Sequence, residues 1–312
     1  MKNILITGVA GFIGSNLASF LLKKGNYKIF GIDNLSYGIF SQVPKDVIFY
    51  QEDIRDKDIS RLFKDIDVVF HLAAKNCISD CQKDPINTVD INIKGSINIF
   101  DAAIKNNVKK IIYADSSSVY EGSKEFPSKE DTINPKSFYA ISKNSTNNYL
   151  SSYVENTSIK ATALRYFNVY GINQDYRRSI PPLISAFIIK ILKNKRPYIY
   201  GDGFKKRDFI HVNDVNIFHE ILINNNQRSN FEIYNVGSGQ NYSVNEILDE
   251  IKTQLNSNIA PIYKNDLPGE ALITLSDITK AKKLGWSAET TLSIGIKEMI
   301  THISKNIIDK IN

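Results

Sequence analysis

Residues 2–14 read KNILITGVAGFIG, an apolar run that ends in three glycines spaced three residues apart, and residues 15–22 continue with the apolar period of a helix. This order predicts a strand, a glycine turn and a helix. Glycines let the backbone turn tightly and approach a pyrophosphate, whose charge is attracted by the amides at the start of the helix. The segment is therefore a candidate for binding a phosphate-containing ligand.

The glycine spacing, G-x-x-G-x-x-G, differs from the usual G-x-G-x-x-G fingerprint of dinucleotide-binding folds, so residues downstream have to support the interpretation. A second apolar run, 27–32, ends in Asp33, at roughly the twenty-residue distance where an acid accepts hydrogen bonds from the adenosine ribose. Because a carboxylate repels a 2′-phosphate, Asp33 favours NAD over NADP. The alternative is an aspartate that only caps the strand end.

Strands and helices alternate through the first half of the chain. Apolar runs predict strands at 47–50, 68–74, 108–114 and 159–166, and helical periods predict helices at 85–105 and 138–153. We therefore predict an α/β fold with a right-handed, doubly wound parallel sheet of the Rossmann type. Its ligand should lie at the carboxyl ends of the strands, where Asp53 could accept a hydrogen bond from the adenine amino group or cap the following helix.

Residues 137–143, SFYAISK, carry the candidate chemistry. Tyr139 and Lys143 are four residues apart, which places them on one face of a helix. The ammonium favours the phenolate and lowers the pKa of the tyrosine, so Tyr139 is a candidate general base. Such pairs also occur by chance on amphipathic helices. Ser116, which opens the serine cluster 116–118 after a predicted strand, supports the functional interpretation.

The regular alternation of strands and helices ends after residue 170. Helices are predicted at 183–192, 244–255 and 277–286, and the segment 201–211, GDGFKKRDFIH, combines glycines with basic residues. Arg207 offers a planar fork that could clamp a diphosphate, and a solvated basic turn is the alternative. We expect a dinucleotide-binding domain at 1–170 and a smaller α/β substrate domain at 171–312, with segments within 204–240 returning to the first domain.

Composition argues against several function classes. The 312-residue chain is 42% hydrophobic and 23% charged, which is typical of a globular protein. No apolar run approaches the roughly 20 residues of a membrane span, and the first strand begins too early for a signal peptide, so we expect a cytoplasmic protein. The net charge of +6 is spread along the chain, which disfavours nucleic acid as a partner. Cys77 and Cys81 lack the further ligands that a metal site needs.

Six ordered motifs together resemble one family. They are GVAGFIG at 8–14, HLAA at 71–74, SSSVY at 116–120, YAISK at 139–143, RYFNVYG at 165–171 and GDGFKKRDFIHVNDV at 201–215. In this set the chain resembles the extended short-chain dehydrogenase/reductases, and within them the nucleotide-sugar 4-epimerases that act on UDP-glucose or UDP-N-acetylglucosamine. The resemblance covers nearly the whole chain and implies a tightly bound NAD, a UDP-sugar substrate and a homodimer.

The resemblance also implies roles for single residues. Tyr139 is implied as the base, Lys143 as the bridge to the nicotinamide ribose, and Ser116 as the partner of the sugar 4-oxygen. Implied contacts to NAD, besides Tyr139 and Lys143, come from Gly8, Gly11, Phe12, Ile13, Gly14, Asp33, Asn34, Asp53, Ile54, Leu72, Ala73, Ala74, Asn92 and Tyr166. Implied contacts to the substrate come from Ser117, Asn168, Arg207, Thr274 and Glu270.

The serine cluster separates subfamilies. In the related sugar 4,6-dehydratases the position before Val119 carries an acid that is needed to eliminate water, whereas this chain has Ser118. The expected chemistry is therefore oxidation and reduction at C4 without elimination of water. Two further positions depart from the family pattern: Asp115 replaces a small residue, and Leu267 replaces an arginine that binds the diphosphate.

The expected reaction is an NAD-dependent C4 epimerisation of a UDP-hexose through a transient 4-keto sugar. Alternatives are an NAD-dependent 4-dehydrogenase or reductase, an epimerase for another nucleotide sugar, and a nucleotide-sensing module without chemistry. Thr274 stands where relatives that exclude acetamido sugars have a tyrosine, so the resemblance predicts room for an N-acetyl group at C2. The alternative is a strand threonine that faces solvent.

Overall fold

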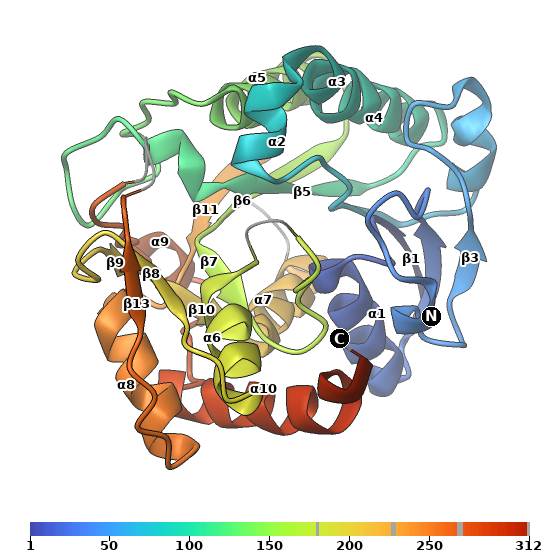
Figure 1. Ribbon diagram of the computed structural model, residues 1–312. Coiled ribbons are helices and arrows are strands. Elements are labelled where there is room, and N and C mark those ends of the chain that lie inside the picture. The colour runs from blue at the N-terminus through green and yellow to red at the C-terminus, as the bar shows by residue number, and fades with distance from the viewer. Residues whose placement is uncertain (179–180, 226–228, 267–270, 311–312) are drawn as a thin grey trace. The chain divides into compact units, whose positions relative to one another are not determined.

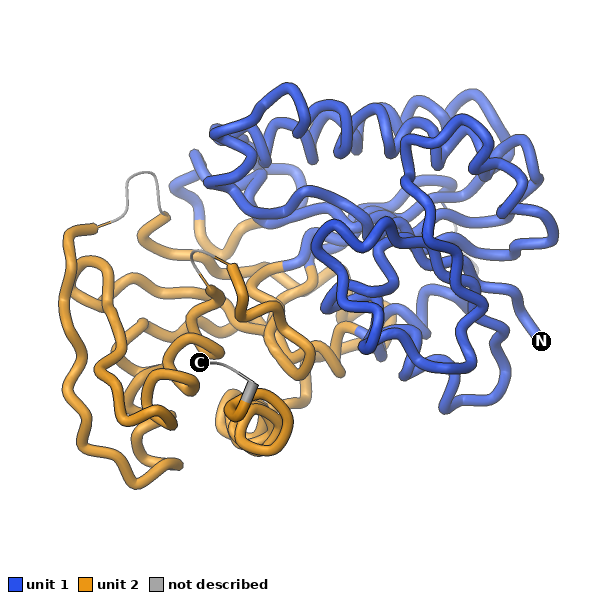
Figure 2. The backbone as a smooth tube through the Cα atoms, turned by 45° about the vertical axis from the view of Figure 1, so that its right-hand side comes forward, with its two compact units in different colours: residues 1–125, 130–166, 216–235 blue, residues 126–129, 167–215, 236–312 orange. Residues whose placement is uncertain are grey.

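The computed structural model describes residues 1–178, 181–225, 229–266 and 271–310, and the chain forms two compact units that Figure 2 shows in different colours. Unit 1 consists of residues 1–125, 130–166 and 216–235. Unit 2 consists of residues 126–129, 167–215 and 236–312. Each unit has its own hydrophobic core.

A seven-stranded sheet in the order β11-β6-β5-β4-β1-β2-β3 forms the centre of unit 1. Its strands are β1 (Lys2–Thr7), β2 (Tyr27–Ile32), β3 (Ile48–Tyr50), β4 (Val68–His71), β5 (Lys110–Ser116), β6 (Lys160–Tyr166) and β11 (Phe231–Val236). The pairings of β1 with β2 and β4, of β2 with β3, and of β5 with β4 and β6 are parallel. The predicted doubly wound parallel sheet is confirmed, and its strand order reverses between β1 and β4.

Helices cover both faces of this sheet (Figure 1). One face carries α1 (Phe12–Lys24), and the other carries α2 (Ile78–Lys83), α3 (Pro85–Val89), α4 (Ser96–Lys105) and α5 (Phe138–Asn156). The core under the second group contains Val69, Phe100, Ile111 and Leu150, all without solvent exposure. Apolar runs without polar alternation are what a strand buried on both faces requires.

The predicted helix at 85–105 is divided into three segments. Between α3 and α4 lies a π-helical turn, η3 (Asp90–Gly95). The Asn92 carbonyl accepts hydrogen bonds from the hydroxyls of Ser96 (2.6 Å) and Thr146 (2.8 Å). These hydroxyls compete with the backbone for that carbonyl, which gives a physical reason for the wider turn.

Two other predicted helices differ in form. The helix expected to follow Asp53 is the 3-10 helix η2 (Lys57–Phe63), and the one at 277–286 contracts to α9 (Thr279–Lys282). Gly285 follows at a φ of 78°, a left-handed conformation that ends the turn. The remaining 3-10 helices are η1 (Phe40–Gln42), η4 (Ser117–Tyr120) and η5 (Ile308–Lys310).

Unit 2 is built from short strand pairs and helices. Its strands are β7 (Asn168–Tyr170), β8 (Tyr198–Tyr200), β9 (Lys206–Arg207), β10 (Phe209–His211), β12 (Tyr242–Ser243) and β13 (Ile262–Lys264). The pairs β7–β10 and β8–β13 are parallel, and β9–β12 is antiparallel. The helices α6 (Leu183–Leu192), α8 (Val244–Gln254) and α10 (Leu292–Asn306) pack on one another, while α7 (Val212–Asn224) passes from unit 2 into unit 1.

None of the helices in the described ranges is long and apolar enough to span a membrane. Among the same residues, no group of three or more His, Cys, Asp or Glu side chains is arranged to hold a metal ion. Cys77 and Cys81 are free thiols.

Candidate active site

The glycine turn after β1 is packed too closely for side chains. Gly8 has a φ of 74°, and a Cβ on it would lie 2.9 Å from the amide nitrogen of Ala73. A Cβ on Gly14 would lie 2.2 Å from the Gly8 carbonyl oxygen. Helix α1 begins at Phe12, with Gly11 as its N-cap, no side-chain cap and no acid in its first turn, which contains Phe12 and Ile13. This cradle of backbone amides fits an anionic pyrophosphate.

Asp33 lies at the carboxyl end of β2, next to the glycine turn. Its Oδ2 accepts a hydrogen bond from the Ala10 amide (3.0 Å), and its Oδ1 accepts one from the Leu35 amide (2.9 Å). Burial raises the pKa of the carboxyl group, and the two backbone donors oppose that rise. Each carboxylate oxygen keeps a further lone pair, so Asp33 can still accept from a ribose hydroxyl.

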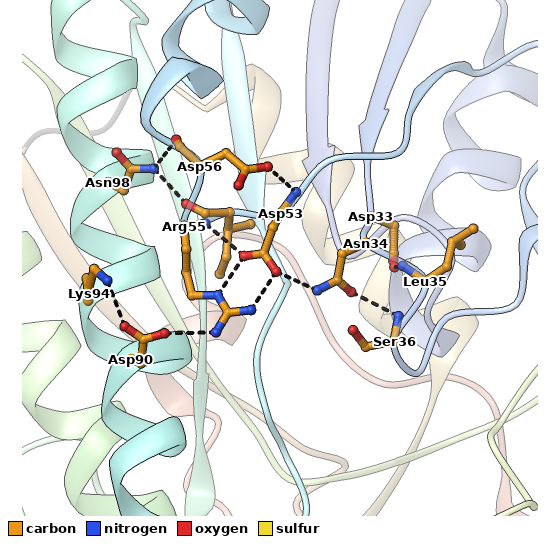
Figure 3. Close-up of polar contacts among 11 residues, drawn as sticks. Asp33, Asn34, Leu35, Ser36, Asp53, Arg55, Asp56, Asp90, Lys94 and Asn98 are labelled. Carbon is orange, nitrogen blue, oxygen red and sulfur yellow. Dashed lines mark hydrogen bonds and ion pairs between the residues drawn. The ribbon is translucent and has the colours of Figure 1, made fainter.

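Asp53 belongs to a polar chain that Figure 3 shows in close-up. Its carboxylate accepts from Nε and Nη2 of Arg55, both at 2.8 Å, and from Nδ2 of Asn34 at 2.7 Å. Arg55 also donates to Asp90 (2.8 Å) in the π-helical turn. The guanidinium holds the pKa of Asp53 well below its usual range. Asp53 therefore links β2 to η3, its contact to adenine stays a prediction, and Arg55 is a residue that the sequence pattern did not single out.

The HLAA segment begins at His71, the last residue of β4, and its Ala73 lies against Gly8. The Ala73 amide donates to the Thr7 hydroxyl (3.2 Å), which pairs with the His71 ring (2.7 Å). Burial lowers the pKa of His71 to about 3, so the ring is neutral and holds the segment in place. Leu72 and Ala74 flank Ala73 and are half-buried.

Asn92 is buried and its side-chain amide makes three hydrogen bonds to the protein. Its Oδ1 accepts from the Lys75 amide (2.8 Å), and its Nδ2 donates to the Lys75 carbonyl and to the Ser142 hydroxyl, both at 3.0 Å. Asn92 thus connects the end of the HLAA segment to helix α5. Its contact to NAD stays a prediction, as does that of the buried Ile54.

Helix α5 has a fixed starting point. The Ser137 hydroxyl accepts from the Ala140 amide (3.1 Å), while the Ser137 amide and hydroxyl donate to the Glu121 carboxylate, both at 2.9 Å. Such a cap stabilises a helix by about 1 kcal/mol. Tyr139, the second residue of the helix, is half-buried, and its position follows directly from this cap.

Lys143 is buried one turn after Tyr139. Its ammonium donates to the Ala114 carbonyl (2.7 Å) and lies 4.9 Å from the centre of the Tyr113 ring. Burial lowers the pKa of Lys143 to about 8, while the nearby carboxylate of Asp115 opposes that change. The cation is therefore anchored to strand β5, two residues before Ser116.

Ser116 ends β5 and opens the next turn. Its Oγ accepts from the Ser118 amide (3.2 Å) and caps η4, which contains Ser117. The Ser118 Oγ is buried and has no hydrogen-bond partner among the described residues. The structure thus brings Ser116, Ser117, Tyr139 and Lys143 into unit 1, on β5, η4 and α5.

Tyr166 lies at the end of β6 and is buried. Its hydroxyl pairs with Nε2 of His219 at 2.6 Å. Burial raises the pKa of Tyr166 above its ordinary value. A contact between this residue and NAD stays a prediction.

Three predicted substrate residues lie together in unit 2. Nδ2 of Asn168 donates to the Asp208 carbonyl (3.1 Å) and to Oγ1 of Thr274 (3.4 Å). The same Thr274 hydroxyl accepts from the Asp208 amide at 3.0 Å, so it faces the protein and not solvent. Arg207, the residue before Asp208, donates from Nη1 to the Lys206 carbonyl at 3.0 Å.

Asp208 is the buried residue that holds this group, and the sequence pattern did not identify it as such. Its carboxylate accepts from the Ser238 amide (2.7 Å), the Ser238 hydroxyl (2.8 Å), the Gly239 amide (3.2 Å) and the Ser276 amide (3.0 Å), and also from the Ser276 hydroxyl. The motif contained the residue, but only tertiary contacts show its partners. Glu270, a predicted substrate contact, and Leu267 lie outside the described residues.

Comparison with known proteins gives consistent results. Residues 4–237 match the model of the NAD dependent epimerase/dehydratase family. A putative UDP-glucose 4-epimerase of Methanocaldococcus jannaschii is 37% identical, with 97% of this chain and 99% of that protein covered.

Two solved structures are similar over almost the whole chain. The UDP-glucose 4-epimerase of Thermotoga maritima, with UDP-glucose, has a TM-score of 0.94 at 32% identity and covers 98% of this chain and 100% of its own. The UDP-N-acetylglucosamine 4-epimerase of Methanobrevibacter ruminantium, in complex with UDP-N-acetylmuramic acid, has a TM-score of 0.93 at 32% identity. The match covers 98% of this chain and 99% of that protein.

Proposed function

The chain belongs to the NAD dependent epimerase/dehydratase family, and from this premise we infer that it is an NAD-dependent UDP-hexose 4-epimerase. It interconverts UDP-glucose and UDP-galactose through a transient 4-keto sugar. The observation that carries this proposal is the anchoring of Lys143 on β5, close to Ser116 and one helical turn from Tyr139. A base, its cation and a hydroxyl for the 4-oxygen are thereby held on two rigid elements.

Each of these residues has a separate task. The Tyr139 phenolate takes the proton of the sugar 4-hydroxyl and later returns it. Lys143 favours the phenolate by its charge, and Ser116 holds the 4-oxygen by a hydrogen bond. NAD, when bound, supplies the reversible oxidation at C4. Because Ser118 offers no acid for the elimination of water, the reaction stops at oxidation and reduction.

We assign NAD to unit 1 and the nucleotide of the substrate to unit 2. The closely packed glycine turn fits the pyrophosphate, and the Asp33 carboxylate beside it selects NAD over NADP. In unit 2, Arg207 offers a charged fork to the diphosphate. Both Nδ2 hydrogens of Asn168 already bind Asp208 and Thr274, so its contact to the substrate would use Oδ1 as the acceptor. This division of roles is part of the proposal, and so is the cytoplasmic location that the sequence suggested.

We also propose that two copies associate through helices of unit 1. Ile86, on α3, is 83% exposed, and Val89, Ile141 and Tyr149 are also exposed on α3 and α5, which pack against each other. Exposed apolar side chains on adjacent helices are typical of a protein interface. Ile86→Glu should convert a dimer to a monomer in light scattering, and a wild-type protein that is already monomeric would contradict the proposal.

The function is tested by incubating the protein with UDP-glucose, UDP-galactose, UDP-N-acetylglucosamine and UDP-glucuronic acid separately. NMR of the sugar ring should show C4 inversion of UDP-glucose and of UDP-N-acetylglucosamine. A ketone that accumulates together with reduced nicotinamide would instead identify a 4-dehydrogenase. No turnover of any sugar, with binding retained, would favour a sensing module.

A further inference from the structure

Asp115 departs from the small residue expected at its position, and it forms a buried ion pair. It lies opposite Arg165 in the register of β5 and β6, and its Oδ2 accepts from Nε of Arg165 at 3.0 Å. The two side chains are 0% and 2% exposed. Burial raises the pKa of Asp115, and the Arg165 guanidinium and the Ser116 amide oppose that rise, so the strand pairing is what allows Asp115 to be charged here.

Arg165 is held on its other side by a polar network of unit 1. Its Nη1 donates to the Tyr120 hydroxyl (2.9 Å) and to the Glu130 carbonyl. The Tyr120 hydroxyl donates to Oδ1 of Asn235 (2.7 Å), and the Asn235 amide donates to the Glu130 carboxylate (3.0 Å). Arg165 therefore has little freedom to move, and the position of the Asp115 carboxylate follows from it.

The same carboxylate reaches the active-site backbone. Oδ1 of Asp115 accepts from the Ser116 amide at 2.8 Å. The Ser116 hydroxyl in turn caps the 3-10 turn that follows. The direction in which the Ser116 side chain leaves the sheet thus depends on a chain of contacts that starts at Arg165.

The Lys143 ammonium donates to the carbonyl of Ala114, the residue before Asp115, so the Asp115 charge acts on the ammonium from nearby. Burial lowers the pKa of Lys143 to about 8, and the carboxylate acts in the opposite direction. Among the described residues, other titratable groups near the ammonium are Tyr113 on β5, His71 on β4 and Cys81 on α2, and Tyr139 lies one turn earlier on the same helix. Among these, His71 is neutral because burial lowers its pKa to about 3.

We propose that Asp115 is a positioning residue of the active site: held by Arg165, it orients Ser116 through the backbone amide and keeps a negative charge beside Lys143. This inference rests on the proposed roles of Ser116 and Lys143. A purely structural Asp115 would only neutralise Arg165, and the two possibilities differ in their effect on the pH profile and on kcat.

The first test is Asp115→Asn, which keeps an oxygen that can accept from the Ser116 amide but removes the charge. The alkaline limb of kcat should move to lower pH by roughly one unit, because Lys143 loses its neighbouring anion. An unmoved limb would contradict the electrostatic part of the proposal.

The second test is Asp115→Ala together with the double variant Asp115→Ala/Arg165→Met. The single variant leaves a buried arginine unpaired and can fail to fold, whereas the double variant removes both charges and should melt near wild type. In the double variant we expect kcat to fall by about 10- to 100-fold with KM little changed, since Ser116 is misplaced. With only serine amides labelled with ¹⁵N, the Ser116 resonance is identified by its loss in Ser116→Ala, and it should also move in the double variant of the NAD-free protein.

A double variant with wild-type kcat and a wild-type alkaline limb would show that Asp115 only balances Arg165, and the inference would be wrong. Ser116→Ala and Tyr139→Phe separate this outcome from a failure of the proposed function. If both of these variants keep full turnover, the proposed function itself is at fault. If both lose turnover while the Asp115 variants behave as wild type, only the inference about Asp115 fails.

Discussion

The two groups of predicted site residues are built in opposite ways. In unit 1, Tyr139 and Lys143 lie on a 19-residue helix, and Ser116 ends a strand that is paired on both sides. In unit 2, Asn168 and Arg207 lie on strands of three and two residues, and one carboxylate, Asp208, gathers the segments around them.

This difference suggests that unit 1 holds its site residues precisely, whereas unit 2 can adapt to different substrates. A long buried sheet and a capped helix hold reacting groups within the narrow limits that proton transfer needs. Short strand pairs joined by one buried side chain can hold a nucleotide and still differ among relatives in their loops. Substitutions in unit 1 should therefore act on kcat, and substitutions in unit 2 should act on KM and on substrate choice.

The largest effect is expected at Tyr139. Tyr139→Phe keeps the ring and removes the acid-base group, so kcat should fall by about 10²- to 10⁴-fold while NAD remains bound. Tyr149→Phe, at an exposed position of the same helix, is the matched control and should change kcat little. Steady-state kinetics of both variants would contradict the assignment if Tyr139→Phe kept its rate within a few-fold.

Substitution of Arg207 should give the next largest effect, and this effect should be on KM and not on kcat. Arg207→Gln removes a charged donor to the diphosphate, which is worth about 1.5–3 kcal/mol, so KM should rise roughly 10- to 100-fold with kcat nearly unchanged. Lys206→Gln, at the exposed neighbouring position, is the control for a general loss of positive charge. A fall in kcat without a change in KM would break the proposed contrast between the units.

The pH dependence of kcat should arise from groups in unit 1 alone. Because the pKa of Lys143 is lowered to about 8, the ammonium loses its proton above that pH, and the phenolate loses its cation. The rate should then fall by up to about tenfold per pH unit, with an apparent pKa that belongs to the Tyr139–Lys143 pair. The pKa of Lys110 is also lowered to about 8, but its ammonium donates to the Leu222 and Asn225 carbonyls.

Lys110→Met is therefore a suitable control for this pH profile. If it moved the alkaline limb of kcat as much as a change at Lys143 does, the limb would report general ionisation and not the catalytic pair.

The smallest effect is expected at Thr274. A tyrosine at position 274 fills space beside Asn168 and Asp208. Thr274→Tyr should therefore lower kcat/KM for UDP-N-acetylglucosamine roughly fivefold relative to UDP-glucose, which corresponds to about 1 kcal/mol. Thr274→Val, which removes the hydroxyl bonded to Asp208 without adding bulk, should weaken both substrates equally. If Thr274→Tyr also lowered kcat/KM equally for both substrates, Thr274 would not be the residue that selects the substituent at C2.

The sequence alone determined the features that depend on residues close together in the chain. Short apolar runs alternating with helical periods predicted the parallel sheet, the glycine spacing predicted the tight turn after β1, and a spacing of four predicted Tyr139 and Lys143 on one face of a helix. All of these follow from backbone geometry over fewer than about twenty residues, which is the range in which periodicity carries information.

Only the tertiary structure decided which distant groups meet. The pair of Asp115 with Arg165 follows from the register of β5 and β6, and the hydrogen bonds of Asp208 follow from segments up to 68 residues apart. The π-helical turn at Asn92 likewise depends on a hydroxyl of Thr146, on another helix. Such contacts are set by packing and by the need to satisfy buried polar groups, and no local pattern records them.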